Sequence, residues 1–88
     1  ALALGLVNRV VPADELDAAV KEYTDFYSSA PTRAIGLIKK MLDKASTSTL
    51  EEMLEYEAYC QEIAGSTQDY KEGVTAFLEK RKAHFTGK

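Results

Sequence analysis

The sequence is poor in the residues that build metal clusters and disulfide frameworks. Among its 88 residues it has one cysteine, Cys60, and one histidine, His84. A single cysteine excludes a disulfide or a cysteine-based metal site within the chain, and a single histidine excludes a histidine cluster. We therefore expect no metal site. Cys60 is most simply a small buried apolar residue in a protein from a reducing compartment.

Long hydrophobic runs are also absent. No apolar stretch approaches the roughly 18 residues that a membrane-spanning helix needs, and no secretory signal is visible. Hydrophobic residues make up 45% and charged residues 28%, which is ordinary for a soluble protein of one small domain. We expect no membrane contact and a cytoplasmic location, with the mitochondrial matrix as the alternative. The start at Ala1 without Met suits a fragment or a processed product.

An excess of positive charge is missing from most of the chain. Residues 1–79 contain seven Lys and Arg against fourteen Asp and Glu, a net charge of −7, and residues 80–88 add four Lys and Arg. Because residues 1–79 carry this negative charge, they repel nucleic acid, and we expect no nucleic-acid partner. The basic end instead suggests a local anion site or a contact between subunits.

Helical periodicity, by contrast, is present along most of the chain. Apolar residues recur at helical spacing in four segments, which predict helices over residues 13–29, 31–44, 50–64 and 68–82. Short polar breaks separate these segments, and no internal repeat or low-complexity linker is present. Four short amphipathic helices joined by brief loops predict an all-α fold, a small orthogonal bundle.

Local signals set the limits of these helices. Pro31 suits the first turn of the second helix, and Ser48 with Glu51 has capping-box spacing before the third helix. Ahead of all four helices, residues 6–11 are rich in β-branched valine and end at Pro12. This composition predicts an extended connector rather than a fifth helix.

The most informative stretch is residues 69–85. Its apolar side chains recur on one face of the predicted helix: Tyr70, Val74, Phe77 and Leu78. A cluster of positive charge follows directly: Lys80, Arg81, Lys82 and His84. Such a helix can lay an apolar edge under a ligand and offer ammonium groups to a phosphate.

The same stretch has the pattern D-x-x-E-G-x-x-A-F-x-E-K-R-x-x-x-F, which resembles the C-terminal signature of the enoyl-CoA hydratase/isomerase (crotonase) family. Residues 5–16 resemble the family segment that joins the catalytic core to its C-terminal helices, and Pro31 and Lys39 match a family helix between the two motifs. The resemblance covers nearly the whole chain. It implies a connector over residues 1–12 and a C-terminal helical domain over residues 13–88.

The resemblance also implies an activity for the protein to which this domain belongs. Enzymes of the family act on acyl-CoA thioesters, so coenzyme A (CoA) would be part of the substrate and no further cofactor is expected. The family's catalytic glutamates and oxyanion-hole amides lie upstream of the position of Ala1, so we expect no catalytic residue and no activity in this chain alone. Hydration, isomerisation and other family reactions share these residues, so neither the reaction nor the acyl chain length is determined. The family implies a homo-oligomer, a trimer or a dimer of trimers.

Two residues match family positions that contact CoA. The lysine at the position of Lys80 contacts the phosphate end of CoA, often in the active site of a neighbouring subunit. Without the resemblance, Lys80 is more simply a solvated helix end. The phenylalanine at the position of Phe77 lines the CoA or acyl pocket; taken alone, Phe77 is an ordinary core residue. Some hydratases have an aromatic contact where this chain has Gln61, which indicates a pocket of different shape.

An alternative from another class is a stand-alone helical module that self-associates or binds another protein. Five aromatic residues suit such an interface: Tyr23, Tyr27, Tyr56, Tyr59 and Phe85. A third reading is an RNA-binding relative of the hydratases. The net charge of −7 over residues 1–79 disfavours it, because RNA binding depends on positive charge.

Overall fold

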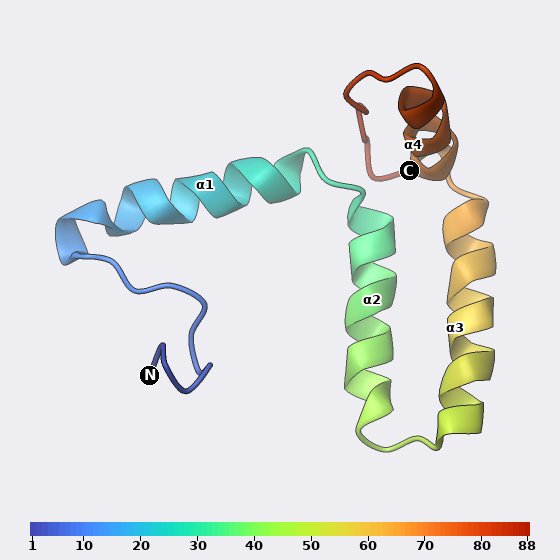
Figure 1. The fold of residues 1–88 in the computed structure, drawn as a ribbon, viewed down its shortest axis with the longest axis horizontal. Coiled ribbons are helices and arrows are strands. Elements are labelled where there is room, and N and C mark those ends of the chain that lie inside the picture. The colour runs from blue at the N-terminus through green and yellow to red at the C-terminus, as the bar shows by residue number, and fades with distance from the viewer.

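Four α-helices and no strand make up the regular structure of the chain, which a computed structural model describes over residues 1–88 (Figure 1). Their bounds are α1 Leu16–Ser28, α2 Thr32–Ala45, α3 Leu50–Gly65 and α4 Gln68–Leu78. The predicted all-α fold of four helices is confirmed. A single 3₁₀ turn, Ala13–Glu15, leads into α1.

The connector before the helices begins with a tight turn. The amide of Gly5 donates to the carbonyl of Leu2 at 3.0 Å, and the amide of Leu6 donates to the carbonyl of Ala1 at 3.1 Å. Gly5 has a φ of 71°, a left-handed conformation that glycine adopts without steric cost. The residues up to Pro12 then run without regular hydrogen bonding, as the prediction of an extended connector requires.

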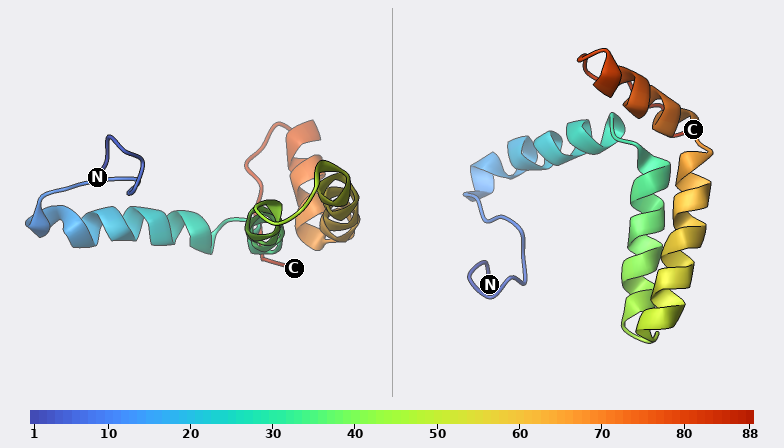
Figure 2. Two further views of the ribbon diagram at one scale, coloured as in Figure 1. Left: turned by 90° about the horizontal axis from the view of Figure 1, so that it is seen from below. Right: turned by 45° about the vertical axis from the view of Figure 1, so that its right-hand side comes forward.

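Helices α2 and α3 form an antiparallel pair, side by side in both views (Figure 2). Cys60, on the α3 side of this contact, is only 2% exposed, so the prediction of a buried cysteine is confirmed. The predicted capping box is wrong by one residue. Thr49, not Ser48, caps α3: its hydroxyl accepts from the amide of Glu52 at 3.2 Å, and the Glu52 carboxylate accepts from the amide of Thr49 at 2.8 Å.

Helix α4 crosses the end of α3 and stops earlier than predicted. It ends at Leu78 instead of Lys82, and Lys80 has a φ of 55°. The chain reverses there, and residues 79–88, which we call the tail, return beside α4 (Figure 1). The prediction failed because lysine and arginine are good helix formers, so the segment carries no local stop signal.

Helix α1 stands apart from the other three (Figures 1 and 2). Along its length only Ala19 is buried, and its larger apolar side chains face solvent, Phe26 with 65% of its surface exposed. Only six of the 88 residues are buried in all. The four helices are too short or too polar to cross a bilayer. The structure therefore shows a set of helices whose apolar faces are largely uncovered.

A candidate ligand-binding end of helix α4

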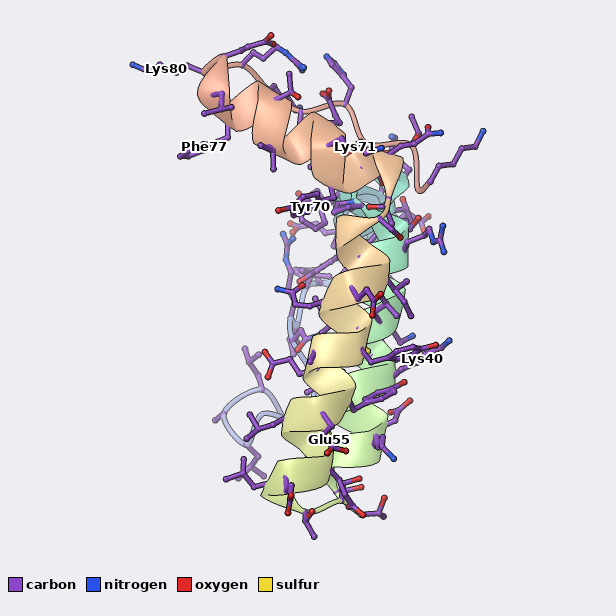
Figure 3. All side chains as sticks on the ribbon, turned by 90° about the vertical axis from the view of Figure 1, so that its right-hand side faces the viewer. Lys40, Glu55, Tyr70, Lys71, Phe77 and Lys80 are labelled. Atoms are coloured by element: carbon purple, nitrogen blue, oxygen red, sulfur yellow. The ribbon has the colours of Figure 1, made fainter.

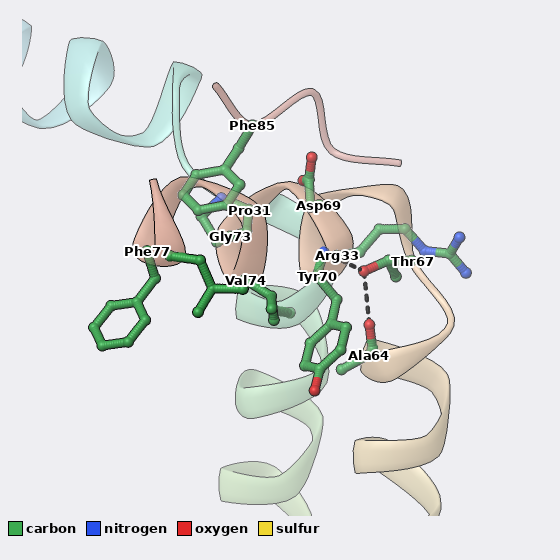
Figure 4. Close-up of a pocket in the computed structure, with 12 residues that line it drawn as sticks. Pro31, Arg33, Ala64, Thr67, Asp69, Tyr70, Gly73, Val74, Phe77 and Phe85 are labelled. Atoms are coloured by element: carbon green, nitrogen blue, oxygen red, sulfur yellow. Dashed lines mark hydrogen bonds between the residues drawn. The ribbon is translucent and has the colours of Figure 1, made fainter. Parts of the chain in front are cut away.

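An apolar groove of about 430 Å³ lies beside α4 (Figure 4). Its walls come from the start of α2, the end of α3, one face of α4 and the tail. The apolar lining includes Pro31, Ala34, Tyr70, Val74, Phe77 and Phe85. The face that forms it is the apolar stripe expected from the sequence of this helix. The groove is open to solvent, so it is a surface on which an apolar molecule or segment can lie.

The start of α4 is fixed by a buried threonine. Thr67 caps the helix: its hydroxyl donates to the carbonyl of Ala64 at 2.6 Å and accepts from the amide of Tyr70 at 3.0 Å (Figure 4). Side-chain caps of this kind satisfy an amide that the helix leaves without a partner. This cap ties the end of α3 to the start of α4, and Ala64, Thr67 and Tyr70 all line the groove.

Phe77 lies at the open end of the groove and is 82% exposed. The simpler interpretation of Phe77 as a core residue is therefore wrong within this chain. An aromatic ring of this size is rarely left uncovered on a stable surface, and burial of a Phe side chain is worth roughly 1.5–3 kcal/mol. The ring is therefore accessible to a molecule or segment that lies on the groove.

Lys80 lies just beyond the end of α4, and its side chain extends from the same free end of the helix as Phe77 (Figure 3). Two hydrogen bonds close the helix at this point: the amide of Lys80 donates to the carbonyl of Phe77 at 3.2 Å, and the amide of Arg81 donates to the carbonyl of Ala76 at 3.0 Å. This pair of bonds surrounds a residue in the left-handed conformation, a position that glycine usually occupies. Lys80 has no carboxylate within ion-pair distance.

Arg81, by contrast, is fully engaged. Its guanidinium donates to both carboxylate oxygens of Glu72, at 2.7 and 2.9 Å, and its Nε donates to Glu79 at 2.6 Å. Glu72 also accepts from the amide of His84 at 2.8 Å. These donors lower the pKa of Glu72 from 4.5 to about 2, with the hydrogen bond to Arg81 as the largest cause. The basic cluster predicted from the sequence is thus divided between a paired arginine and unpaired lysines.

A second carboxylate, Asp69, holds the end of the tail. It is 4% exposed, and it accepts from the amides of Thr86 at 2.7 Å and Gly87 at 2.8 Å. The amide of Asp69 in turn donates to the carbonyl of Lys88 at 3.0 Å. Between the two carboxylates, the ring of Phe85 packs on α4 where Gly73 leaves room, 3.5 Å from where a Cβ would lie. These contacts therefore hold the tail against α4.

Sequence reasoning did not assign these roles to Asp69 and Glu72. The two residues are three apart on a helix, so they share a face, and that spacing was the available signal. Their partners lie nine to eighteen residues further along the chain, beyond the reach of helical spacing. His84 is exposed, as expected, and takes part through its backbone only. No cluster of three or more potential metal ligands forms in the structure.

Comparison with known proteins defines the class to which these helices belong. The family model described as "Enoyl-CoA hydratase/isomerase" matches residues 1–88, and the chain belongs to this family. The resemblance of the two end motifs is therefore confirmed.

Individual relatives include both an isomerase and a hydratase. It is 39% identical over 84 residues to the 1,2-epoxyphenylacetyl-CoA isomerase of Escherichia coli K12, covering 96% of this chain and 32% of that protein. It is 39% identical over 88 residues to the crotonyl-CoA hydratase of Syntrophomonas wolfei, covering 100% of this chain and 34% of that protein. A crystal structure of "Enoyl-CoA Hydrates Subunit I" from Geobacillus kaustophilus superimposes with a TM-score of 0.91 at 37% identity, over 99% of this chain and 34% of that one. The chain spans about one third of the length of these relatives.

Proposed function

We propose that this chain is the C-terminal helical domain of an enzyme that acts on acyl-CoA thioesters. The observation that carries the proposal is the family match over residues 1–88, combined with the position of Phe77 and Lys80 at one free helix end. In this proposal the domain completes the CoA site and contributes oligomer contacts, and the acid/base groups of the reaction lie in the remaining two thirds of the protein.

The roles of Phe77 and Lys80 follow from their chemistry. An exposed ring beside an apolar groove offers a flat surface to the apolar part of a thioester, and an unpaired ammonium offers a point charge to a phosphate. The two groups lie close together on one helix end (Figure 3). A CoA thioester carries both partners, an apolar acyl-pantetheine arm and a phosphorylated nucleotide.

Oligomer contacts are proposed from the uncovered face of α1. Leu16, Val20, Phe26 and Tyr27 are all about half exposed or more, and Phe26 and Tyr27 pack edge to face at 5.3 Å between ring centroids. An apolar stripe of this length on a projecting helix is typical of an interface. The other part of the same subunit, or a second subunit, would cover it.

The test uses the intact enzyme that contains this domain. We expect Lys80→Ala and Phe77→Ala each to raise the KM for an acyl-CoA substrate, by about tenfold for the lysine because a charge-assisted contact is worth roughly 1.5–3 kcal/mol. Lys71→Ala, on the same helix but away from this end (Figure 3), is the matched control and should leave the KM unchanged. Equal KM values for all four proteins would contradict the assignment of the site.

The predicted inactivity of the chain alone is tested separately. The purified 88-residue chain should hydrate crotonyl-CoA no faster than buffer, because it is proposed to lack the acid/base groups. Hydration well above the buffer rate would show that the chemistry lies within these residues and would overturn this division of roles.

A further inference from the structure

We propose that Glu72 and Arg81 are positioning residues that hold Lys80 for its ligand. The inference rests on the proposed function, in which Lys80 contacts a phosphate of CoA. It adds a reason for the conformation of the lysine and names the two residues that maintain it. Neither Glu72 nor Arg81 touches the ligand in this account; both act through Lys80.

The conformation of Lys80 is the first observation. Its φ of 55° makes it the one residue other than glycine with a positive φ in the chain. Glycine is the usual residue at this point after a helix, because a Cβ crowds the neighbouring carbonyl in the left-handed region. Lys80 is exposed and forms no ion pair, so no packing within the chain compensates for the missing glycine. Residues in such sparsely populated backbone conformations cluster at functional sites.

The second observation is the set of bonds on both sides of Lys80. Arg81, the next residue, is fixed by its two bonds to Glu72 on α4. Glu79, the preceding residue, is fixed by its bond to the Nε of the same arginine. Lys80 therefore lies between two residues that one guanidinium ties together, and the backbone has little freedom to return to the helical conformation. Bidentate pairing of this kind fixes geometry as well as charge.

The third observation concerns charge. Without Arg81, the Glu79 carboxylate would have no partner and Glu72 would keep only the amide of His84, and the Lys80 ammonium would be the nearest residue along the chain to pair with Glu79. By taking both carboxylates, Arg81 leaves the Lys80 ammonium free for an external anion. The pair thus keeps the lysine both oriented and available.

The test compares Glu72→Gln, Lys80→Ala and the double variant in the intact enzyme. Each is assayed with an acyl-CoA and with the matching acyl-pantetheine, which lacks the nucleotide phosphates. We expect Glu72→Gln to raise the KM for the acyl-CoA about three- to tenfold, with kcat within about twofold and the acyl-pantetheine KM unchanged. In the Lys80→Ala background the same substitution should have no further effect. Arg81→Lys should behave like Glu72→Gln, because an ammonium cannot form the bidentate pair.

Glu62→Gln on α3, an exposed glutamate without an ion pair, is the control and should match the wild type. If Glu72→Gln alters both substrates equally, or if its effect adds in full to that of Lys80→Ala, Glu72 has a merely structural role. The inference is then overturned while the proposed function stands. If instead Lys80→Ala leaves the acyl-CoA KM unchanged, Lys80 does not contact the ligand. The positioning role of Glu72 and Arg81 is then contradicted together with that part of the proposed function.

Discussion

Helices α1 and α4 are both short and amphipathic, but their surroundings differ. Helix α4 is held by the tail through Asp69 and Glu72, and it lines a groove shared with α2 and α3. Helix α1 has exposed ion pairs, Lys21 with Asp25 and Glu22 with Arg9 of the connector, and it projects away from the other helices (Figure 1). The comparison teaches that amphipathicity alone does not fix a helix in place. Contacts from the tail fix α4, whereas α1 is joined to the connector by an exposed ion pair with Arg9, and most of its apolar face is uncovered.

The largest predicted effect is a loss of stability in α4, and a matched pair of substitutions compares it with the loss in α1. Asp17 and Asp69 are each the second residue of their helix, so both have the same favourable interaction with the helix dipole. Only Asp69 also holds the tail. We expect Asp69→Ala to destabilise α4 and the tail by about 2–3 kcal/mol, because it removes a charged acceptor from two part-buried hydrogen bonds with backbone amides. Faster amide exchange at Thr86 and Gly87 would report the loss.

Asp17→Ala is the control and should destabilise α1 by less than about 1 kcal/mol. Equal losses of stability from the two substitutions would show that the tail contributes nothing to the stability of α4. The two helices would then differ only in how exposed their apolar side chains are.

Acid should loosen the tail from α4. The pKa of Glu72 is about 2 in the folded chain and about 4.5 without its partners, so its bonds to Arg81 and His84 stabilise the fold fully above pH 4.5. This contribution falls as the pH is lowered through 4.5 and is lost near pH 2. We expect the amide of His84 to lose its protection from exchange over this window. In Glu72→Gln the dependence should disappear; its persistence would assign the effect to other carboxylates.

A smaller effect on stability tests whether the conformation of Lys80 at the end of α4 is strained. Lys80→Gly should stabilise the chain by up to about 1 kcal/mol, because glycine removes the Cβ that the left-handed conformation disfavours. Lys80→Ala keeps that Cβ and should not give the same gain. Chemical denaturation of the three proteins provides the comparison. A loss of stability in the glycine variant would mean that the lysine side chain contributes to folding.

The smallest predicted effect is on the surface of α1. Lys21→Ala removes the exposed pair with Asp25, one helical turn away, and should cost less than about 0.5 kcal/mol. The helical content of the chain, measured by circular dichroism, should hardly change. A large loss would show that α1 depends on its own surface charges and not on an external partner.

Local patterns were enough to predict the four helices and their faces. Periodicity located the stripe of Tyr70 and Val74, and Cys60 was expected in the interior. The cap of α3 was misplaced because Ser48 with Glu51 and Thr49 with Glu52 both have the required spacing. Only the backbone geometry selects the second pair, in which Thr49 is extended, with a ψ of 165°.

Features that depend on long-range contacts were not predictable in this way. The end of α4 is determined by bonds between the tail and residues on the helix, and helical propensity at Lys80 and Arg81 points the other way. The separation of α1 from the other helices could not be predicted either. An amphipathic helix has the same apolar stripe whether the surface that packs on it belongs to this chain or to another. The roles of Phe77 and Lys80 in CoA binding stay predictions.

The most direct test of the central claim is the affinity of the intact enzyme for CoA itself, measured by calorimetry at fixed salt. If the free end of α4 binds the phosphorylated part of CoA, Lys80→Ala should raise the Kd about tenfold, a loss of 1.4 kcal/mol, whereas Lys71→Ala should leave it unchanged. Identical Kd values for the wild type and both variants would contradict the claim that this helix end is part of the CoA site.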